Sequence, residues 1–295
     1  MANFQRSYLL SAGKNGGSGF QIGNIGNAEN VLHISFSVEK SDSETVNTAK
    51  VQIWNLSDRN LKILESKDIL LELKAGYGGN MTLILVGNVT YVTTSPDGAD
   101  RVTEIEVADG RVALRDTNIS VSKNGVVNTK DLYEHIAARM GMSVVFAKDL
   151  SFVTLPNGYS FVGKGRNALQ RTADANRHKW TVQNGVIQVT LPGRPVNTGG
   201  YLLNSDSGLI SVPKRVRISQ NGTDEALTGF EVEYLLNGAI GVNDVVELES
   251  ATANGYYRVH KVTMDGDNMT GDWVCVAQLL EIQAASKLDK KAASA

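Results

Sequence analysis

The sequence predicts a mainly β protein with a small α+β segment in its middle, and three observations support that prediction. Asn-Gly and Asp-Gly pairs recur along the chain, and both pairs favour the positive φ angles of tight hairpin turns. The segments beside these turns alternate apolar and polar residues, which is typical of strands with one buried face. The longer apolar period of a helix is clear in two segments, and both lie between residues 115 and 195.

Strands are predicted at residues 31–39, 50–55, 68–77, 81–93, 101–108, 229–236, 245–249, 256–264 and 273–282. A short helix is predicted at 58–64, where Ser57 is a suitable N-cap. A β-hairpin is predicted at 180–189, because Asn184-Gly185 separates two short β-branched runs.

The two longer helices are predicted at 129–140 and 166–177. The first has apolar residues four apart, with Asn128 at its N-cap and Gly141 just after its end. These helices divide the chain into a β domain, an α+β middle domain, a second β domain and a short tail. The predicted boundaries are 1–115, 116–195, 196–284 and 285–295.

Length and composition exclude several classes of protein. The 295 residues include 29 Lys and Arg against 31 Asp and Glu, for a formal net charge of −2. The 42% hydrophobic content is enough to bury a core, and the length predicts two or three domains. The single cysteine, Cys275, excludes an intrachain disulfide framework and a cysteine zinc cluster. Balanced charge argues against a protein that coats nucleic acid.

The sequence shows no targeting or membrane segment. Its first residues lack the apolar core of a signal peptide, and no apolar run approaches the length of a membrane helix. We therefore expect synthesis in a cytoplasm and no membrane insertion.

Residues 163–168, Gly-Lys-Gly-Arg-Asn-Ala, resemble a dinucleotide-binding turn between a strand and a helix. The surrounding pattern does not support that function, because the next strand does not end in Asp or Glu and βαβ units do not repeat. A plain strand-to-helix turn is the better interpretation. The basic residues between 164 and 179 likewise favour a solvated helix face or contact with an acidic partner over phosphate binding.

Residues 265–272 gather three aspartates, as calcium loops do. Met269 and Thr270 stand where an EF-hand needs an oxygen ligand and a glycine, so a solvated hairpin turn is favoured. Weak calcium binding stays open. The four histidines are dispersed and no two have metal-binding spacing, so neither a metal nor a cofactor is predicted.

The sequence assigns no catalytic residue. Glu104 and Glu106 alternate with apolar residues, as on the solvent face of a strand, and Cys275 lies in an apolar strand, as a buried structural thiol does. The tryptophans at 54, 180 and 273 stand in apolar alternation, which indicates core positions.

An ordered series of short motifs is more specific than any of these features. Residues 51–57 end in Asn-Leu-Ser, the short helix follows, a strand then reaches Ala-Gly-Tyr at 75–77, and an apolar strand ends at Gly87. This series resembles the N-terminal barrel of the baseplate hub (tail-tip hub) proteins of tailed bacteriophages. The resemblance extends over roughly residues 30–283 through these later segments: 131–141, 159–163, 180–189, 242–246, 256–259 and 271–273.

The resemblance implies two tail-tube-like β-barrel domains flanking the α+β domain, in a structural virion protein of the tail baseplate. It implies a homotrimeric ring that adapts the hexameric tail tube to the trimeric spike and closes the tube end. The implied partners are the tail tube protein, the central spike protein, the tape measure protein and other baseplate proteins. Neither enzyme activity nor specific nucleic-acid binding is expected.

The polar segment 40–47 is a candidate hairpin that reaches onto a neighbouring subunit, with Asp42, Glu44 and Thr45 as the predicted intersubunit contacts. An ordinary surface loop is an equal alternative.

Two other functions stay open. A tail-associated enzyme that degrades cell wall would need an active carboxylate, for which Glu104, Asp174 and Asp265 are the first residues to test. A receptor-binding or carbohydrate-binding β-module would need exposed aromatic side chains, and only 6% of residues are aromatic.

Overall fold

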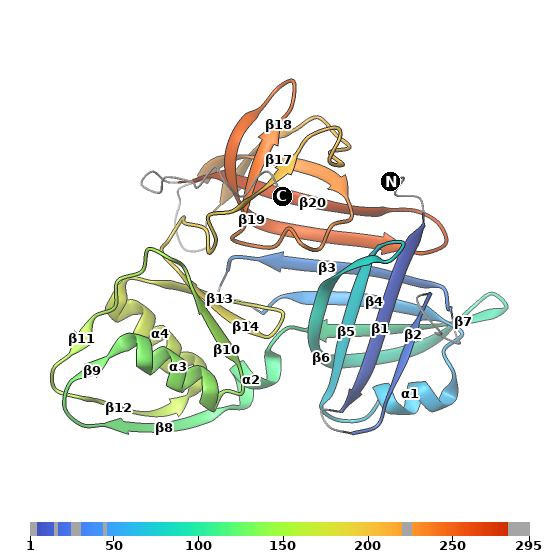
Figure 1. Cartoon of the computed structure of the whole chain (residues 1–295). Coiled ribbons are helices and arrows are strands. Elements are labelled where there is room, and N and C mark those ends of the chain that lie inside the picture. The colour runs from blue at the N-terminus through green and yellow to red at the C-terminus, as the bar shows by residue number, and fades with distance from the viewer. Residues whose placement is uncertain (1–4, 15–16, 25–30, 44–45, 220–225, 283–295) are drawn as a thin grey trace.

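The computed structural model (Figure 1) describes residues 5–14, 17–24, 31–43, 46–219 and 226–282. Strands account for 55% of the structure and helices for 14%. The mainly β class predicted from the sequence is therefore confirmed. Within the described residues, no helix is both long enough and apolar enough to cross a membrane.

The elements fall into three successive segments. The first contains β1 (Arg6–Lys14), β2 (Gly19–Gly23), β3 (Ile34–Ser41), β4 (Thr48–Trp54), α1 (Asp58–Leu64), β5 (Ile69–Tyr77), β6 (Asn80–Asp97), β7 (Asp100–Ala108) and α2 (Arg111–Asp116). The middle contains β8 (Asn118–Lys123), β9 (Val127–Asn128), α3 (Thr129–Arg139), β10 (Ser143–Phe146), β11 (Thr154–Leu155), β12 (Tyr159–Lys164), α4 (Gly165–Asn176), β13 (Lys179–Gln183) and β14 (Val186–Thr190). The last contains β15 (Gly200–Leu203), β16 (Lys214–Ser219), β17 (Ala226–Leu235), β18 (Val245–Glu249), β19 (Asn254–Asp267) and β20 (Trp273–Glu281).

The first and last segments share one sheet. Its strand order is β16-β17-β20-β19-β3-β4-β7-β6-β5-β1-β2, with β18 and β15 added beside β19. The seam between the segments is the antiparallel pair β3–β19, in which Phe36 lies opposite Gly266. In Figure 1, β1 and β5 run across β3 and β4, so the sheet curls back over its own core. Through the described strands, the hydrogen-bonded order runs from β16 to β2 as one continuous path.

Two hydrophobic cores result from this arrangement. The larger one draws on both β segments, from Tyr8 to Leu279, and the smaller one lies between Leu114 and Val189. The smaller core packs α3 and α4 against the small sheet β10-β14-β13. The domain boundaries at 115, 195 and 284 stay predictions, although the smaller core lies almost wholly between the first two.

The helix ends follow the predicted chemistry. The Ser57 hydroxyl accepts a hydrogen bond from the Asn60 N–H at the start of α1, and the Asn128 side chain accepts one from the Lys130 N–H at the start of α3. Gly141 follows α3 with a φ of 69°, a left-handed conformation that glycine adopts without strain. Helix α2 has no predicted counterpart, because it is only six residues long and has no side-chain cap.

Candidate junction and interaction surfaces

The turn between β3 and β4 contacts the middle segment through a buried ion cluster centred on Asp42. Arg258 Nη1 donates a 2.6 Å hydrogen bond to Asp42 Oδ2, and Lys179 Nζ lies 3.3 Å from the same oxygen. His260 Nδ1 lies 2.9 Å from Asp42 Oδ1. Burial raises the pKa of the Asp42 carboxyl, but the His260 contact and the charges of Arg258 and Lys179 outweigh it, so the pKa lies well below its usual range. The cluster joins all three segments of the chain at one carboxylate.

A second buried contact holds the turn of the β13–β14 hairpin. Asn184 and Gly185 have positive φ angles of 51° and 76°, as a tight hairpin turn requires. Asp109 accepts hydrogen bonds from both of their backbone N–H groups, at 2.5 and 2.8 Å. Lys40 Nζ donates to Asn184 Oδ1 at 2.7 Å, although Lys40 is only 4% exposed. The predicted hairpin is thus confirmed, and its turn is fixed to the large sheet by two charged side chains.

Burial alters the pKa of both charged groups at this turn. It lowers the pKa of Lys40 to about 8, with the nearby Asp109 carboxylate acting in the opposite direction. It also raises the pKa of Asp109, although the two backbone N–H groups and Lys40 oppose that shift. Lys40 was missed in the sequence, where a usable signal exists: it continues the buried face of Ile34, Phe36 and Val38 at every second position.

Between these two contacts, amide side chains join the same elements. Asn47 Nδ2 donates to the Val182 carbonyl at 2.8 Å, and Gln183 Nε2 donates to the Ser41 carbonyl at 2.9 Å. Asn243 accepts from Arg258 Nη1 at 2.8 Å and donates to Gln188 at 3.2 Å. We call these contacts together the polar junction: the Asp42 ion cluster, the contacts of Asp109 and Lys40 with the hairpin turn, and the amide hydrogen bonds between them. A junction built from matched polar groups fixes orientation more sharply than an apolar contact does, because each hydrogen bond requires a defined geometry.

The segment 40–47, predicted to reach onto a neighbour, makes these contacts within its own chain. Asp42 is engaged by Arg258, while Glu44 and Thr45 lie outside the described residues. The intersubunit contact at Asp42, Glu44 and Thr45 stays a prediction.

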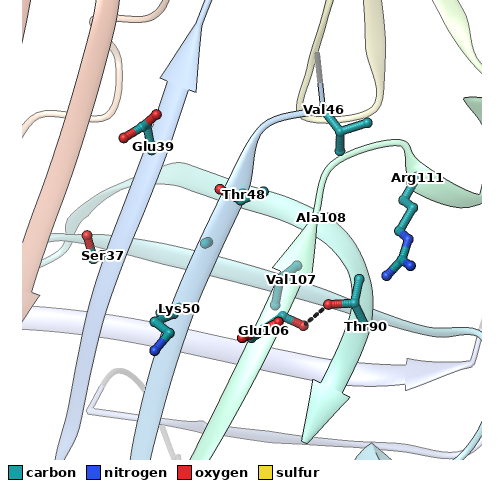
Figure 2. A pocket seen from close by; sticks show the side chains of 11 residues that line it. Ser37, Glu39, Val46, Thr48, Lys50, Thr90, Glu106, Val107, Ala108 and Arg111 are labelled. Carbon is teal, nitrogen blue, oxygen red and sulfur yellow. Dashed lines mark hydrogen bonds between the residues drawn. The ribbon is translucent and has the colours of Figure 1, made fainter.

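A groove of about 640 Å³ lies on the sheet face next to the junction (Figure 2). Its floor comes from β3, β4 and β7, with Glu39, Lys50 and Glu106 on it, and Arg111 of α2 stands at its side. Lys50 is paired with Glu104 at 2.9 Å, and the Thr90 hydroxyl donates to the Glu106 carbonyl at 3.1 Å. The floor is therefore a polar sheet face, as predicted for Glu104 and Glu106.

The glycine turn at 163–168 has a packing explanation. A Cβ on Gly165 would lie 2.7 Å from the Met140 side chain, so this glycine allows α4 to approach α3 closely. The Gly165 N–H donates to the Thr117 carbonyl at 2.9 Å, which occupies one of the groups that would bind a phosphate. Both contacts favour the predicted strand-to-helix turn.

The aspartates at 265–272 lie at the hairpin of β19 and β20: Asp265 and Asp267 are in the last residues of β19, and Asp272 is in the turn. Asp267 Oδ1 accepts hydrogen bonds from the N–H groups of Met269 and Thr270, both at 2.8 Å, and Asp267 also pairs with His33. Within the described residues, no group of three or more His, Cys, Asp or Glu side chains is arranged to hold a metal ion. The hairpin-turn interpretation is confirmed.

The carboxylates and the cysteine considered as possible catalytic groups take part in structural contacts or are buried. Glu104 pairs with Lys50 on the sheet face, and Asp174 accepts from Gln170 along α4. The carboxyls with a raised pKa are the buried Asp109 and the half-buried Asp244, and both accept backbone N–H groups. Cys275 is fully buried, and burial raises the pKa of its thiol to about 11, as expected of a structural cysteine.

The tryptophan prediction is correct at two of its three positions. Trp180 and Trp273 are buried. The prediction is wrong for Trp54, which is half-buried at the end of β4 and stacks on His33 with ring centroids 3.8 Å apart. Trp54 shares the outward face of β4 with Lys50 and Gln52, opposite the buried face of Val51 and Ile53.

Comparison with known proteins places this fold. No protein-family model matches the chain, and no curated protein is similar to it in sequence. The 43 kDa tail protein of prophage MuSo2 from Shewanella oneidensis has a similar structure, with a TM-score of 0.58 at 10% identity over 94% of this chain and 98% of that one. The tail protein from Neisseria meningitidis MC58 gives a TM-score of 0.59 at 10% identity, over 93% and 96% of the two chains.

A third similar structure is the E. coli c3393 protein, described as a component of the type VI secretion system with structural similarity to the T4 bacteriophage tail proteins gp27 and gp5. Its TM-score is 0.55 at 9% identity, over 87% of this chain and 76% of that one. At these identities the likeness shows a shared fold. The chain thus has the fold of phage tail and baseplate proteins. The resemblance found in the sequence is confirmed at that level.

Proposed function

We propose that this chain is a baseplate hub: a structural virion protein of which three copies form a ring between the tail tube and the central spike. The observation that supports this best is the fold itself, because the MuSo2 prophage tail protein and the Neisseria tail protein match nearly the whole of this chain and of their own. The partners are the tail tube, spike and tape measure proteins and other baseplate proteins.

The construction of the chain suits a load-bearing adaptor. The first and last segments are joined by the β3–β19 seam, so force on one β segment passes through main-chain hydrogen bonds into the other. The polar junction attaches the middle segment to the same sheet through Asp42 and Asp109. A rigid unit of this kind can be repeated around an axis without changing shape.

The proposed role is structural, without catalysis. The carboxylates of the sheet face are exposed or paired with lysine, and the buried Asp109 and the half-buried Asp244 accept hydrogen bonds from backbone N–H groups. The near-zero net charge fits a conduit that DNA crosses without being held, because strong phosphate binding needs clustered Lys and Arg.

Light scattering of the purified chain tests the ring. We expect a mass of three times 31.8 kDa, and we expect the chain in purified tails by mass spectrometry of virions. A strictly monomeric chain that is absent from tails would overturn the proposal. A turbidity assay on isolated cell wall tests the enzymatic alternative, for which clearing that Glu104→Gln abolishes would be required.

A further inference from the structure

The β6–β7 hairpin extends beyond the sheet that carries it. Strand β6 pairs with β5 only up to Asn88, whereas its pairing with β7 continues to Asp97. From Thr90 onward, the other edge of β6 therefore has no strand partner among the described residues. Residues 93–100 are all exposed, and Tyr91 is 55% exposed. In Figure 1 the end of this hairpin projects from the body of the molecule beside the label β7.

This free edge lacks the usual protection against pairing. Proteins protect exposed edges with lysine, proline, bulges or very short strands. Residues 90–95, Thr-Tyr-Val-Thr-Thr-Ser, carry no charge and consist mostly of residues that favour strands, and Pro96 comes only near the end of β6. The one bulge lies between Val89 and Tyr91, at the base of the free edge. The edge is therefore open to an added strand along most of its length.

One face of the same hairpin is acidic. Four carboxylates, from Asp97, Asp100, Glu104 and Glu106, share the face that also carries Tyr91 and Thr93. Lys50 of β4 pairs with Glu104, and among the described residues no ion pair within 4 Å involves Asp97, Asp100 or Glu106. The small Thr93 and Ser95 side chains leave room for a long cation on an added strand to reach these carboxylates.

Strand β16 has the complementary character. It pairs with β17 on one side only, and its other edge has no strand partner among the described residues. Lys214, Arg215 and Arg217 are exposed, and Arg215 and Arg217 point to the same face because they are two positions apart. In the described part of the chain, none of these three cations forms an ion pair. Their two-residue spacing matches that of Glu104 and Glu106.

We infer that β16 of one copy of this chain adds to the free edge of β6 of the next copy, with Arg215 and Arg217 over the acidic face. This inference rests on the proposed ring and names its interface. The two surfaces differ and lie on different parts of the chain, so the contact is head-to-tail and closes into a ring when the rotation allows it. Main-chain hydrogen bonds supply affinity, and the charges set the register.

Charge reversal tests the interface directly. Arg215→Glu with Arg217→Glu, or Asp100→Lys with Glu106→Lys, should each weaken self-association at least about ten-fold in sedimentation equilibrium, because like charges then face each other. The four substitutions together should restore it to within about three-fold. The control pair Arg139→Glu with Arg166→Glu makes the same charge change on exposed residues of α3 and α4 and should leave association unchanged. Circular dichroism and thermal melting confirm that each variant is folded.

Hydrogen exchange gives a second measurement that needs no variant. Amides of residues 90–95 and 214–218 should exchange more slowly as the wild-type concentration rises through assembly. Protection confined to residues 40–47, or association unchanged by both reversals, would overturn the inference while leaving the ring proposal intact. A monomeric wild type would remove both. Binding of a single-stranded DNA oligonucleotide that Arg215→Glu with Arg217→Glu abolishes, with assembly unaffected, would assign β16 to a polyanion instead.

Discussion

Arg258 donates a 2.6 Å hydrogen bond to Asp42 across 216 positions of sequence, and each residue is only 3% exposed. The pair connects β19 to the turn after β3, and Lys179 of the middle segment approaches the same carboxylate. A buried ion pair is costly to form and costly to leave half-made, because a single remaining charge has lost its hydration.

Removing Arg258 should therefore destabilise the chain strongly. Arg258→Met should lower the free energy of unfolding by about 3–5 kcal/mol, because it leaves Asp42 buried with weaker partners. Urea denaturation measures this. Asp42→Asn combined with Arg258→Met should recover much of the loss. As a control, Arg115→Ala breaks the exposed Arg115–Asp116 pair and should cost much less, because solvent screens an exposed ion pair. A loss below that of the control would show that the Asp42 pair does not stabilise the fold.

Acid should weaken the same cluster. The pKa of Asp42 is lower in the folded chain than its ordinary value, so the unfolded chain binds the extra proton first as pH falls. The stability from Asp42 is complete above about pH 4 and is lost as pH falls through the folded pKa. Urea denaturation of wild type and Asp42→Asn should be measured from about pH 6 to about pH 2, a range that spans the ordinary carboxyl pKa. The difference between their free energies of unfolding should shrink as the pH falls. A constant difference would contradict this assignment.

Whereas acid should destabilise the fold through Asp42, alkali should stabilise it through Lys40. Its folded pKa of about 8 lies below its ordinary 10.5, so between these values the unfolded chain holds the proton more tightly and stability rises with pH. The Cys275 thiol has the opposite effect: its pKa is raised to about 11 in the folded chain, so its ionisation lowers the stability of the fold as pH rises over an overlapping range. Comparison with Lys40→Met isolates the contribution of the lysine. Between the two pKa values of Lys40, the free energy of unfolding of the wild type should rise by on the order of 3 kcal/mol relative to that of the variant. A parallel pH profile for the two proteins would refute the shift.

Asp109 should hold the β13–β14 turn locally. Asp109→Ala leaves the N–H groups of Asn184 and Gly185 without their acceptor and should cost about 1–3 kcal/mol. Hydrogen exchange at these two amides should accelerate more than at the amides of α3. Asp109→Asn, which keeps one carbonyl acceptor, should fall between wild type and alanine. The exposed Asp149→Ala is the matched control. Equal losses of stability at the two positions would show that Asp109 does not hold the hairpin turn.

The seam between the first and last segments depends on Gly266. A Cβ there would overlap the ring of Phe36 on the neighbouring strand, and Phe36 itself packs edge-on against Trp273. Gly266→Ala should destabilise by about 1–3 kcal/mol through overpacking. Adding Phe36→Leu should reduce that cost. If the melting temperature of Gly266→Ala equals that of the wild type, β3 and β19 are not packed as described.

The sequence was informative where the signal is local. Asn184-Gly185 predicts its hairpin, and Ser57 and Asn128 predict their helix starts, because each acts on groups a few residues away. The Asp42–Arg258 pair carries no such signal, since nothing near either residue indicates a partner 216 positions away. The half-buried Trp54, by contrast, does carry a local signal, because strand alternation places it on the face of Gln52, opposite the buried Val51 and Ile53.

The β3–β19 seam also imposes an order on biosynthesis. The ribosome makes β3 early, but its partner β19 lies close to the end of the chain. Until β19 is made, the inner edge of the first segment stays unpaired, and Ile34, Phe36 and Val38 lack part of the wall that later encloses them. Non-local strand pairing of this kind is slow and leaves an open edge during synthesis. A chain released before β19 is complete would therefore present a β3 edge ready to pair with another copy.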